Sequence, residues 1–192
     1  MSVYPLPLSL KGVLYIAGEG KQFEESLETS CNEQGIFALR IRDVNPMAIK
    51  KGQSVPKNKY DFILYHKGYL FPVELKSTKA KSFGYGEDKI KQYQLESLKK
   101  ASLFKGVIPG LIINFREPEN VAYFIHINDF LKCKEISEKG LPHTYSNKLN
   151  KSSISIKTCE EVGIELKSAL KKKYHRFYLN QLLDELIDKY GE

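Results

Sequence analysis

Two carboxylates and a lysine stand at the ends of two apolar segments that a hairpin would bring together. Asp61 precedes the segment FILYH, and Glu74 and Lys76 end the segment YLFPVELK. Gly68 follows the polar residue Lys67, which is a common signal for a short turn. Counting outward from a turn centred between these two residues places Asp61 opposite Glu74. Because side chains alternate along a strand, Lys76 shares their face.

Such a group is suited to metal-dependent hydrolysis. Directly opposed residues have Cβ atoms about 4.5–5.5 Å apart, and like charges there destabilise a sheet unless a cation lies between them. Mg²⁺ takes oxygen ligands and usually keeps several waters, which leaves positions for the oxygens of a substrate phosphate. Lys76 can then steady the attacking water or the developing charge.

Two features leave this interpretation open at the level of the residues alone. Pro72 cannot donate to a ladder, so the register can slip beside it, and a slip by one residue turns Asp61 to the other face. The D…ExK pattern is also short and common. Taken alone, it favours ordinary charges at a solvated strand end.

The composition fits one globular α/β domain and a polyanionic partner. The chain has 192 residues, 42% of them hydrophobic, and a formal net charge of +7. This length supplies one adequate core rather than two full domains, and the lysine excess suits nucleic acid. No stretch approaches the ~18 apolar residues of a transmembrane helix, and the N-terminus lacks a signal-peptide pattern. We therefore expect no membrane partner and a cytoplasmic location.

Zinc, disulfide and HNH-type sites are not indicated. The three cysteines, Cys31, Cys133 and Cys159, are odd in number and have no CxxC spacing. None of the four histidines has metal-ligand or HNH-like spacing.

The N-terminal part predicts an arm and then a helix. Residues 1–19 hold a proline-interrupted apolar segment and are expected to form the arm. Residues 21–34 have a helical pattern that places Glu24 on the side of Leu27 and Cys31. Glu24 is therefore a candidate site residue, although an acidic residue that complements the helix dipole is an equal alternative.

A strand and a basic loop come next. Residues 36–42 alternate apolar and polar side chains, which predicts a strand. Residues 44–59 are polar, basic and proline-containing, which predicts a loop or small protrusion rather than a core element. Its lysines either contact DNA phosphates or are a solvated charge run; they are Lys50, Lys51, Lys57 and Lys59.

The segments after the hairpin predict a substrate loop and a helix. The loop KSTKAKSFGYGEDK holds the expected DNA contacts Lys79, Lys81 and Ser82. Residues 87–104 predict a long helix in which Gln94 interrupts the inward-facing stripe. Burying an amide without hydrogen bonds costs about 1–3 kcal/mol. Gln94 therefore needs a partner, either structural or belonging to the metal site.

The remaining residues complete a single domain that spans 1–192. Residues 107–115 and 121–127 predict two strands, and Asn128 is expected to cap a helix over 129–138. Residues 160–192 are expected to be a C-terminal helical region, with a final helix from 174 to 190. Its start is strongly basic, with Lys171, Lys172, Lys173, His175 and Arg176.

Taken in order, these features resemble a PD-(D/E)xK nuclease core. The segments GKQFEESL, ELKSTKAKSF, KIKQYQLESLKKA and GVIPGLIINFRE further resemble the RecU family of Holliday junction resolvases, in particular the small versions of phages and prophages. The resemblance covers roughly residues 20–132 and extends more weakly to the C-terminus. It implies an α/β fold with a restriction-endonuclease-like mixed β-sheet core flanked by helices.

The resemblance implies a role for each candidate residue. Asp61 and Glu74 would bind Mg²⁺, with Mn²⁺ as a substitute, helped by the carbonyl of Leu75. Lys76 would assist the hydrolytic water, and Gln94 would orient Lys76 or that water.

One further role and two departures from the usual pattern complete the comparison. Glu24 would be the first-helix acidic residue that holds a second metal or a bound water. Tyr60 stands where the PD signature has proline. The loop 44–59 would correspond to a stalk inserted through the junction centre, but it is short here.

The implied activity is that of a Mg²⁺-dependent endodeoxyribonuclease that resolves four-way DNA junctions by paired symmetric nicks. Two symmetric cuts require two identical sites, so a homodimer is expected. A recombinase contact is left open, and the location would be the cytoplasm of a bacterial host. Two alternatives stand beside this function: a nuclease for flap or duplex DNA, and a catalytically silent DNA-binding accessory protein of recombination.

Overall fold

The computed structural model describes residues 18–42, 57–172 and 174–191. Most of the expected arm and of the basic loop, including Lys50 and Lys51, therefore lies outside the described residues. No helix in these ranges is long and apolar enough to cross a membrane.

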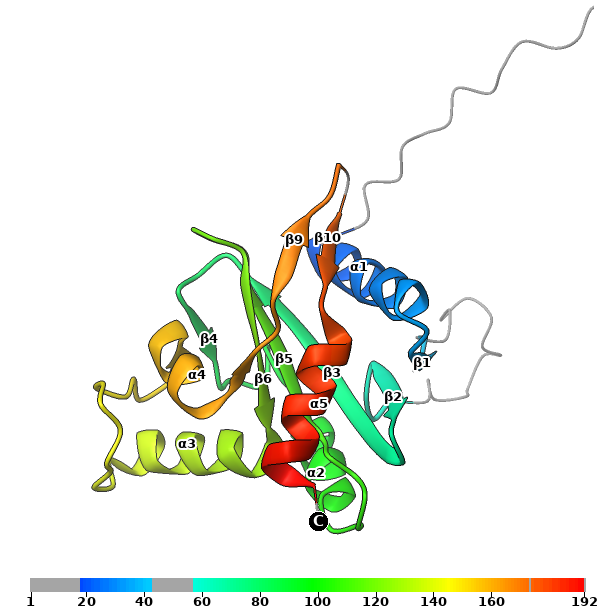
Figure 1. The fold of residues 1–192 in the computed structure, drawn as a ribbon. Helices are drawn as coiled ribbons and strands as arrows, with labels where there is room; N and C mark the ends of the chain where they lie inside the picture. Colours follow the sequence, from blue (N-terminus) through cyan, green and yellow to red (C-terminus); the bar gives the residue numbers. More distant parts are fainter. Residues whose placement is uncertain (1–17, 43–56, 173, 192) are drawn as a thin grey trace, which may run out of the picture.

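A six-stranded mixed sheet forms the centre of the fold (Figure 1). Its strands are β1 Phe37–Arg40, β2 Phe62–His66, β3 Tyr69–Thr78, β5 Gly110–Phe115, β6 Val121–His126 and β8 Ile164–Glu165. They lie side by side in this order. The first three are antiparallel, β5 runs parallel to β3, and β6 and β8 are antiparallel to their neighbours. The expected mixed sheet is confirmed.

Helices cover both faces of this sheet and bury two apolar cores. The helices are α1 Glu19–Glu33, α2 Gln92–Ala101, α3 Ile127–Lys139, α4 Ile156–Val162 and α5 Leu179–Tyr190. Side chains of α1 and α5 share one core with β2 and β3. Side chains of α2, α3 and α4 share the other core with β5 and β6. Figure 1 shows α5 in front of the sheet and α2 behind it.

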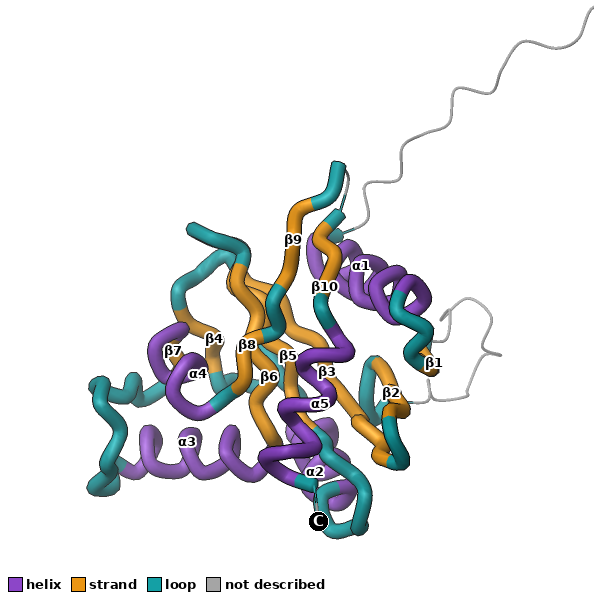
Figure 2. Tube along the Cα trace, viewed as in Figure 1, coloured by secondary structure: helices purple, strands orange, loops and turns teal. Residues whose placement is uncertain are grey.

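Two pairs of short strands lie outside the central sheet. β4 Ser82–Gly84 pairs with β7 Ser153–Ser155, and β9 Ser168–Leu170 pairs with β10 His175–Phe177. Figure 2 shows the β9–β10 hairpin beside α1. Both pairs bring together segments that the sequence pattern did not mark as strands.

The predicted hairpin register is confirmed. His66 pairs with Tyr69, and Phe62 pairs with Val73. Lys67 and Gly68 both have positive φ, 47° and 86°, which is the backbone of the tight turn that suits a right-twisted hairpin.

Pro72 sits in this central strand without shifting the register. The N–H of Leu70 donates to the carbonyl of Gly106, on the side away from β2. Residues two apart on a strand point their main-chain groups to the same side. The backbone nitrogen of Pro72, which carries no hydrogen, therefore faces the segment before β5. The hydrogen-bond ladder between β3 and β5 starts only at Val73 and Gly110.

Several predicted boundaries are wrong for local hydrogen-bonding reasons. The helix predicted over 87–104 begins at Gln92, because the Glu87 carboxylate accepts the Gln92 N–H and holds a turn there. Asn128 does not cap the next helix. That helix begins at Ile127, and the His126 ring accepts the Asn128 N–H.

The C-terminal region 160–192 is not purely helical, which corrects the prediction. It contains the end of α4, the strands β8, β9 and β10, and α5, which begins at Leu179 rather than at 174. β8 is only two residues long, which is too short to carry a strand signal in its own sequence. It is stabilised by pairing with the distant strand β6.

Candidate active site

The site lies where β3 continues past the start of β2. The strand β2 begins at Phe62, whereas β3 runs on to Thr78 and leaves one edge without a main-chain partner. Asp61 fills the first part of this edge. Its N–H donates to the Val73 carbonyl at 3.0 Å, and its Oδ2 accepts the Leu75 N–H at 2.7 Å. A side chain thus replaces the missing ladder bond and fixes the carboxylate beside β3.

Glu74 is the buried centre of the site. Its side chain is 1% exposed, and its Oε1 accepts from Lys76 Nζ at 2.7 Å and from Gln94 Nε2 at 2.6 Å. Its Oε2 has no hydrogen-bond partner within the described ranges. One oxygen is therefore held by two donors, while the other remains available to a cation.

Gln94 connects this site to α2. The side chain is 8% exposed, and its Oε1 accepts the Lys91 N–H at 3.2 Å, at the start of the helix. Its amide nitrogen donates to Glu74. Gln94 thus has both kinds of partner that the sequence left open. The Lys91 N–H is the structural partner, and Glu74 is the partner in the site.

The two carboxylates perturb each other. Burial, and then the negative charge of Asp61, raises the pKa of Glu74 to about 7 from 4.5. Burial also raises the pKa of Asp61, against the lowering effects of the Leu75 N–H and of Lys76. One lysine therefore does not fully offset two buried carboxylates, and an added cation would stabilise both in their ionised form.

The donor set fits Mg²⁺. It consists of the carboxylates of Asp61 and Glu74, with Oε2 of Glu74 unpaired. The carbonyl of Leu75 lies on the same strand edge as its N–H, which faces Asp61. Within the described ranges no cluster of three or more His, Cys, Asp or Glu could hold a metal. Water and substrate phosphate would complete the shell, as is usual for Mg²⁺.

Glu24 borders the site but is engaged by another residue. Its Oε2 pairs with Arg40 at 2.5 Å, and the same guanidinium binds Glu28 at 2.8 Å. The charge of Glu24 contributes to raising the pKa of Asp61. Sequence reasoning missed Arg40, whose only signal was the alternation of polar residues along the first strand.

The described lysines predicted to bind DNA lie in different surroundings. Lys57 Nζ stands 5.2 Å from the ring centroid of Tyr93, on α2. Lys59 is exposed, and Lys79 pairs with Glu19 at 3.3 Å. Beyond these, Lys81 is exposed and Ser82 pairs with Ser155 in the two-stranded β4–β7 sheet.

The raised pKa of Glu74 predicts how Mg²⁺ binding at this site would depend on pH. Below about pH 7 a proton competes for Glu74, so we expect the Mg²⁺ affinity to fall about tenfold per pH unit there. In metal-free protein the folded-state pKa is raised above 4.5, so unfolding should become easier as pH rises from about 4.5 to 7. Thermal unfolding at several pH values, with and without Mg²⁺, checks both the Mg²⁺ affinity and the stability of the metal-free protein. The Mg²⁺-induced rise in Tm should be larger at pH 8 than at pH 6, and an equal rise would contradict the assignment.

Comparisons with known proteins show the family of the chain. The family model described as Recombination protein U (RecU) matches residues 35–172. This range includes Asp61, Glu74, Lys76 and Gln94, whereas Glu24 precedes it. The chain is also 54% identical over 171 residues to the SPbeta prophage-derived uncharacterized protein YotM of Bacillus subtilis (strain 168). That alignment covers 89% of this chain and 88% of YotM.

Among solved structures, one similar chain is Hjc of Archaeoglobus fulgidus, a Holliday junction resolvase from an archaeal hyperthermophile. The TM-score is 0.47 at 14% sequence identity, over 76% of this chain and 95% of Hjc.

Proposed function

The chain belongs to the RecU family, and from this membership we propose that it is a Holliday junction resolvase whose active site is the Asp61–Glu74 pair. The observation that carries the site assignment is the buried Glu74 carboxylate. It has two donors on one oxygen and none on the other, and a second carboxylate lies beside it. A carboxylate held in this way is preorganised for a cation that binds phosphate.

We propose that Asp61, Glu74 and the Leu75 carbonyl hold Mg²⁺, with Mn²⁺ as a substitute. When bound, the ion polarises the phosphoryl oxygens and lowers the pKa of a coordinated water. Lys76, at 2.7 Å from Glu74 Oε1, orients the attacking water and stabilises negative charge as a phosphodiester P–O bond breaks. Gln94 holds the Glu74 rotamer and acts as a positioning residue.

The surrounding residues are proposed to act on water and on the DNA backbone. Glu24, held by Arg40, orients a water at the border of the site. The net charge of +7 supports DNA binding by basic residues that precede and follow the β2–β3 hairpin in the sequence. The proposed DNA contacts are Lys50, Lys51, Lys57, Lys59, Lys79, Lys81 and Ser82.

We propose that the protein acts as a homodimer. Each chain contributes one Asp61–Glu74 site, and a two-fold dimer presents two such sites in symmetric positions. Symmetry of this kind matches the two opposite strands of a four-way junction, which must both be cut to give ligatable products.

Parallel cleavage of three DNA substrates tests the substrate assignment. We expect the wild-type protein with Mg²⁺ to cut a four-way junction at a higher rate than a flap or a linear duplex of the same sequence. Equal rates on all three would assign a general nuclease. Tight binding without any cleavage would assign a DNA-binding accessory protein.

A further inference from the structure

The hairpin of β9 and β10 has a basic tip that the proposed active site does not use. Residues 167–178 include Lys167, Lys171, Lys172 and Arg176 but no aspartate or glutamate, and Arg176 pairs with Glu33 of α1 at 3.1 Å. Lys171 and Lys172 are both exposed, and no described acidic side chain forms an ion pair with either. Adjacent cations without a counter-ion create a local positive potential that attracts a polyanion.

The base of this hairpin is anchored to α1. The ring of Phe177 packs edge-on against Phe23, with centroids 5.4 Å apart. The N–H of Phe177 donates to Ser30 Oγ at 3.0 Å, and its carbonyl accepts from Gln34 Nε2 at 2.7 Å. The tip projects past α1 in Figure 1. An anchored basic tip is preorganised, so less conformational entropy is lost when an anion binds to it.

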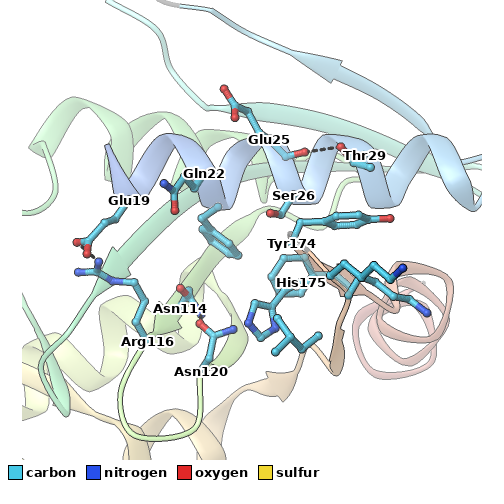
Figure 3. Close-up of a pocket in the computed structure, with 15 residues that line it drawn as sticks. Glu19, Gln22, Glu25, Ser26, Thr29, Asn114, Arg116, Asn120, Tyr174 and His175 are labelled. Carbon is cyan, nitrogen blue, oxygen red and sulfur yellow. Dashed lines mark hydrogen bonds and ion pairs between the residues drawn. The ribbon is translucent and has the colours of Figure 1, made fainter. Parts of the chain in front are cut away.

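A pocket of about 640 Å³ lies between this tip and α1 (Figure 3). Lys171 and Lys172 line it from the hairpin, and Ser26 lines it from α1. Asn114 and Arg116, at the end of β5, line it from the sheet. Ammonium, guanidinium, amide and hydroxyl groups are the donors that proteins use to hold phosphate and sugar oxygens of DNA.

Two carboxylates also line this pocket, but neither cancels the charge of the tip. Glu19 forms ion pairs with Arg116 and with Lys79. The carboxylate of Glu25 points away from the pocket in Figure 3. The lysines of the tip therefore face the opening without an acidic partner there.

The pocket and the active site adjoin the same end of β3, on opposite faces of the sheet. Asn114 lines the pocket and accepts a hydrogen bond from Ser77 Oγ at 3.1 Å, and Ser77 directly follows Lys76 in β3. Because side chains alternate along a strand, Lys76 and Ser77 point to opposite faces, and neighbouring residues of a strand are only about 3.3 Å apart. One turn of B-DNA spans about 34 Å. A duplex that contacts the tip can therefore reach the Asp61–Glu74 site within the same turn.

We propose that the tip of the β9–β10 hairpin and the adjoining pocket bind the sugar–phosphate backbone of a DNA arm beside the cut strand. This inference rests on the proposed function, because it assigns the hairpin to the same substrate. Backbone contacts of this kind fix the orientation of a duplex without reading its bases.

The test is the double variant Lys171→Ala/Lys172→Ala. Each phosphate contact contributes about 0.9 to the slope of log affinity against log salt, so we expect the slope to fall by about 1 to 2. Near 150 mM salt, binding to a four-way junction and to a linear duplex should weaken on the order of tenfold. At low salt and saturating DNA the cleavage rate should equal that of wild type, since no active-site group has changed.

Lys105→Ala/Lys132→Ala is the matched control, with the same loss of charge. Both residues are exposed, in the α2–β5 connection and in α3, at the end of the fold away from the hairpin in Figure 1. If both double variants show the same affinity and slope, the hairpin site is overturned. If the wild type cuts no junction but its DNA binding still depends on Lys171 and Lys172, the proposed function fails and the hairpin site stands. A wild type that binds neither DNA overturns both.

Discussion

Replacement of Glu74 by alanine is expected to abolish junction cleavage and to leave junction binding within a few-fold of wild type. The substitution removes a metal ligand and the acceptor shared by Lys76 and Gln94. The loss should exceed the ~10²–10⁴-fold that is typical of one acid–base group, because the metal and the lysine are displaced together. Single-turnover cleavage of a labelled four-way junction, with binding measured in Ca²⁺, separates the two effects.

Glu74→Gln is the control for folding. It keeps the side-chain volume and leaves one oxygen to accept from Lys76 and Gln94, but it lacks the negative charge. We expect the same loss of cleavage, together with loss of the Mg²⁺-induced rise in Tm. Cleavage by Glu74→Gln within about tenfold of wild type would overturn the site assignment.

Lys76→Ala is expected to lower the cleavage rate by about 10²–10⁴-fold at saturating junction. The lysine is 20% exposed and sits 2.7 Å from Glu74 Oε1, so it can reach both the carboxylate and a bound substrate. Its charge also lowers the pKa of Glu74. Removing it should therefore shift the pH midpoint for Mg²⁺ binding to a higher value, which a purely structural lysine would not do.

Lys79→Ala provides the comparison for Lys76. Lys79 follows the same strand, but its side chain is 61% exposed and pairs with Glu19. We expect this variant to cleave at a rate near that of wild type once DNA is saturating. An equal loss of cleavage rate in the two variants would mean that Lys76 contributes only its positive charge and not its position beside Glu74.

The central hairpin is the part of the fold that the sequence predicted best. A two-residue turn fixes the pairing of every following residue, so one Gly after Lys67 was enough to place Asp61 near Glu74. The inward position of Gln94 was readable for a similar reason, because helical periodicity is regular over several turns. Both signals are local.

The features that the sequence did not predict depend on distant partners. The hairpin of β9 and β10 consists of two three-residue strands, and its base is stabilised by α1, about 140 positions earlier in the chain. The ion pairs of Arg40 likewise join β1 to α1. The β9–β10 hairpin leaves no periodic pattern in its own segment, and the alternation over residues 36–42 predicts a strand but not the partners of Arg40. Lys171 and Lys172, which looked like the start of a helix, follow β9, and His175 and Arg176 lie in β10.

The most direct test of the proposed activity is strand-resolved cleavage of a synthetic four-way junction, with each of its four strands labelled in turn. We predict Mg²⁺-dependent nicks at symmetric positions in two opposite strands, and no nicks in EDTA. Cleavage in EDTA, or Mg²⁺-dependent nicks confined to one strand, would contradict a metal-dependent resolvase built on Asp61 and Glu74.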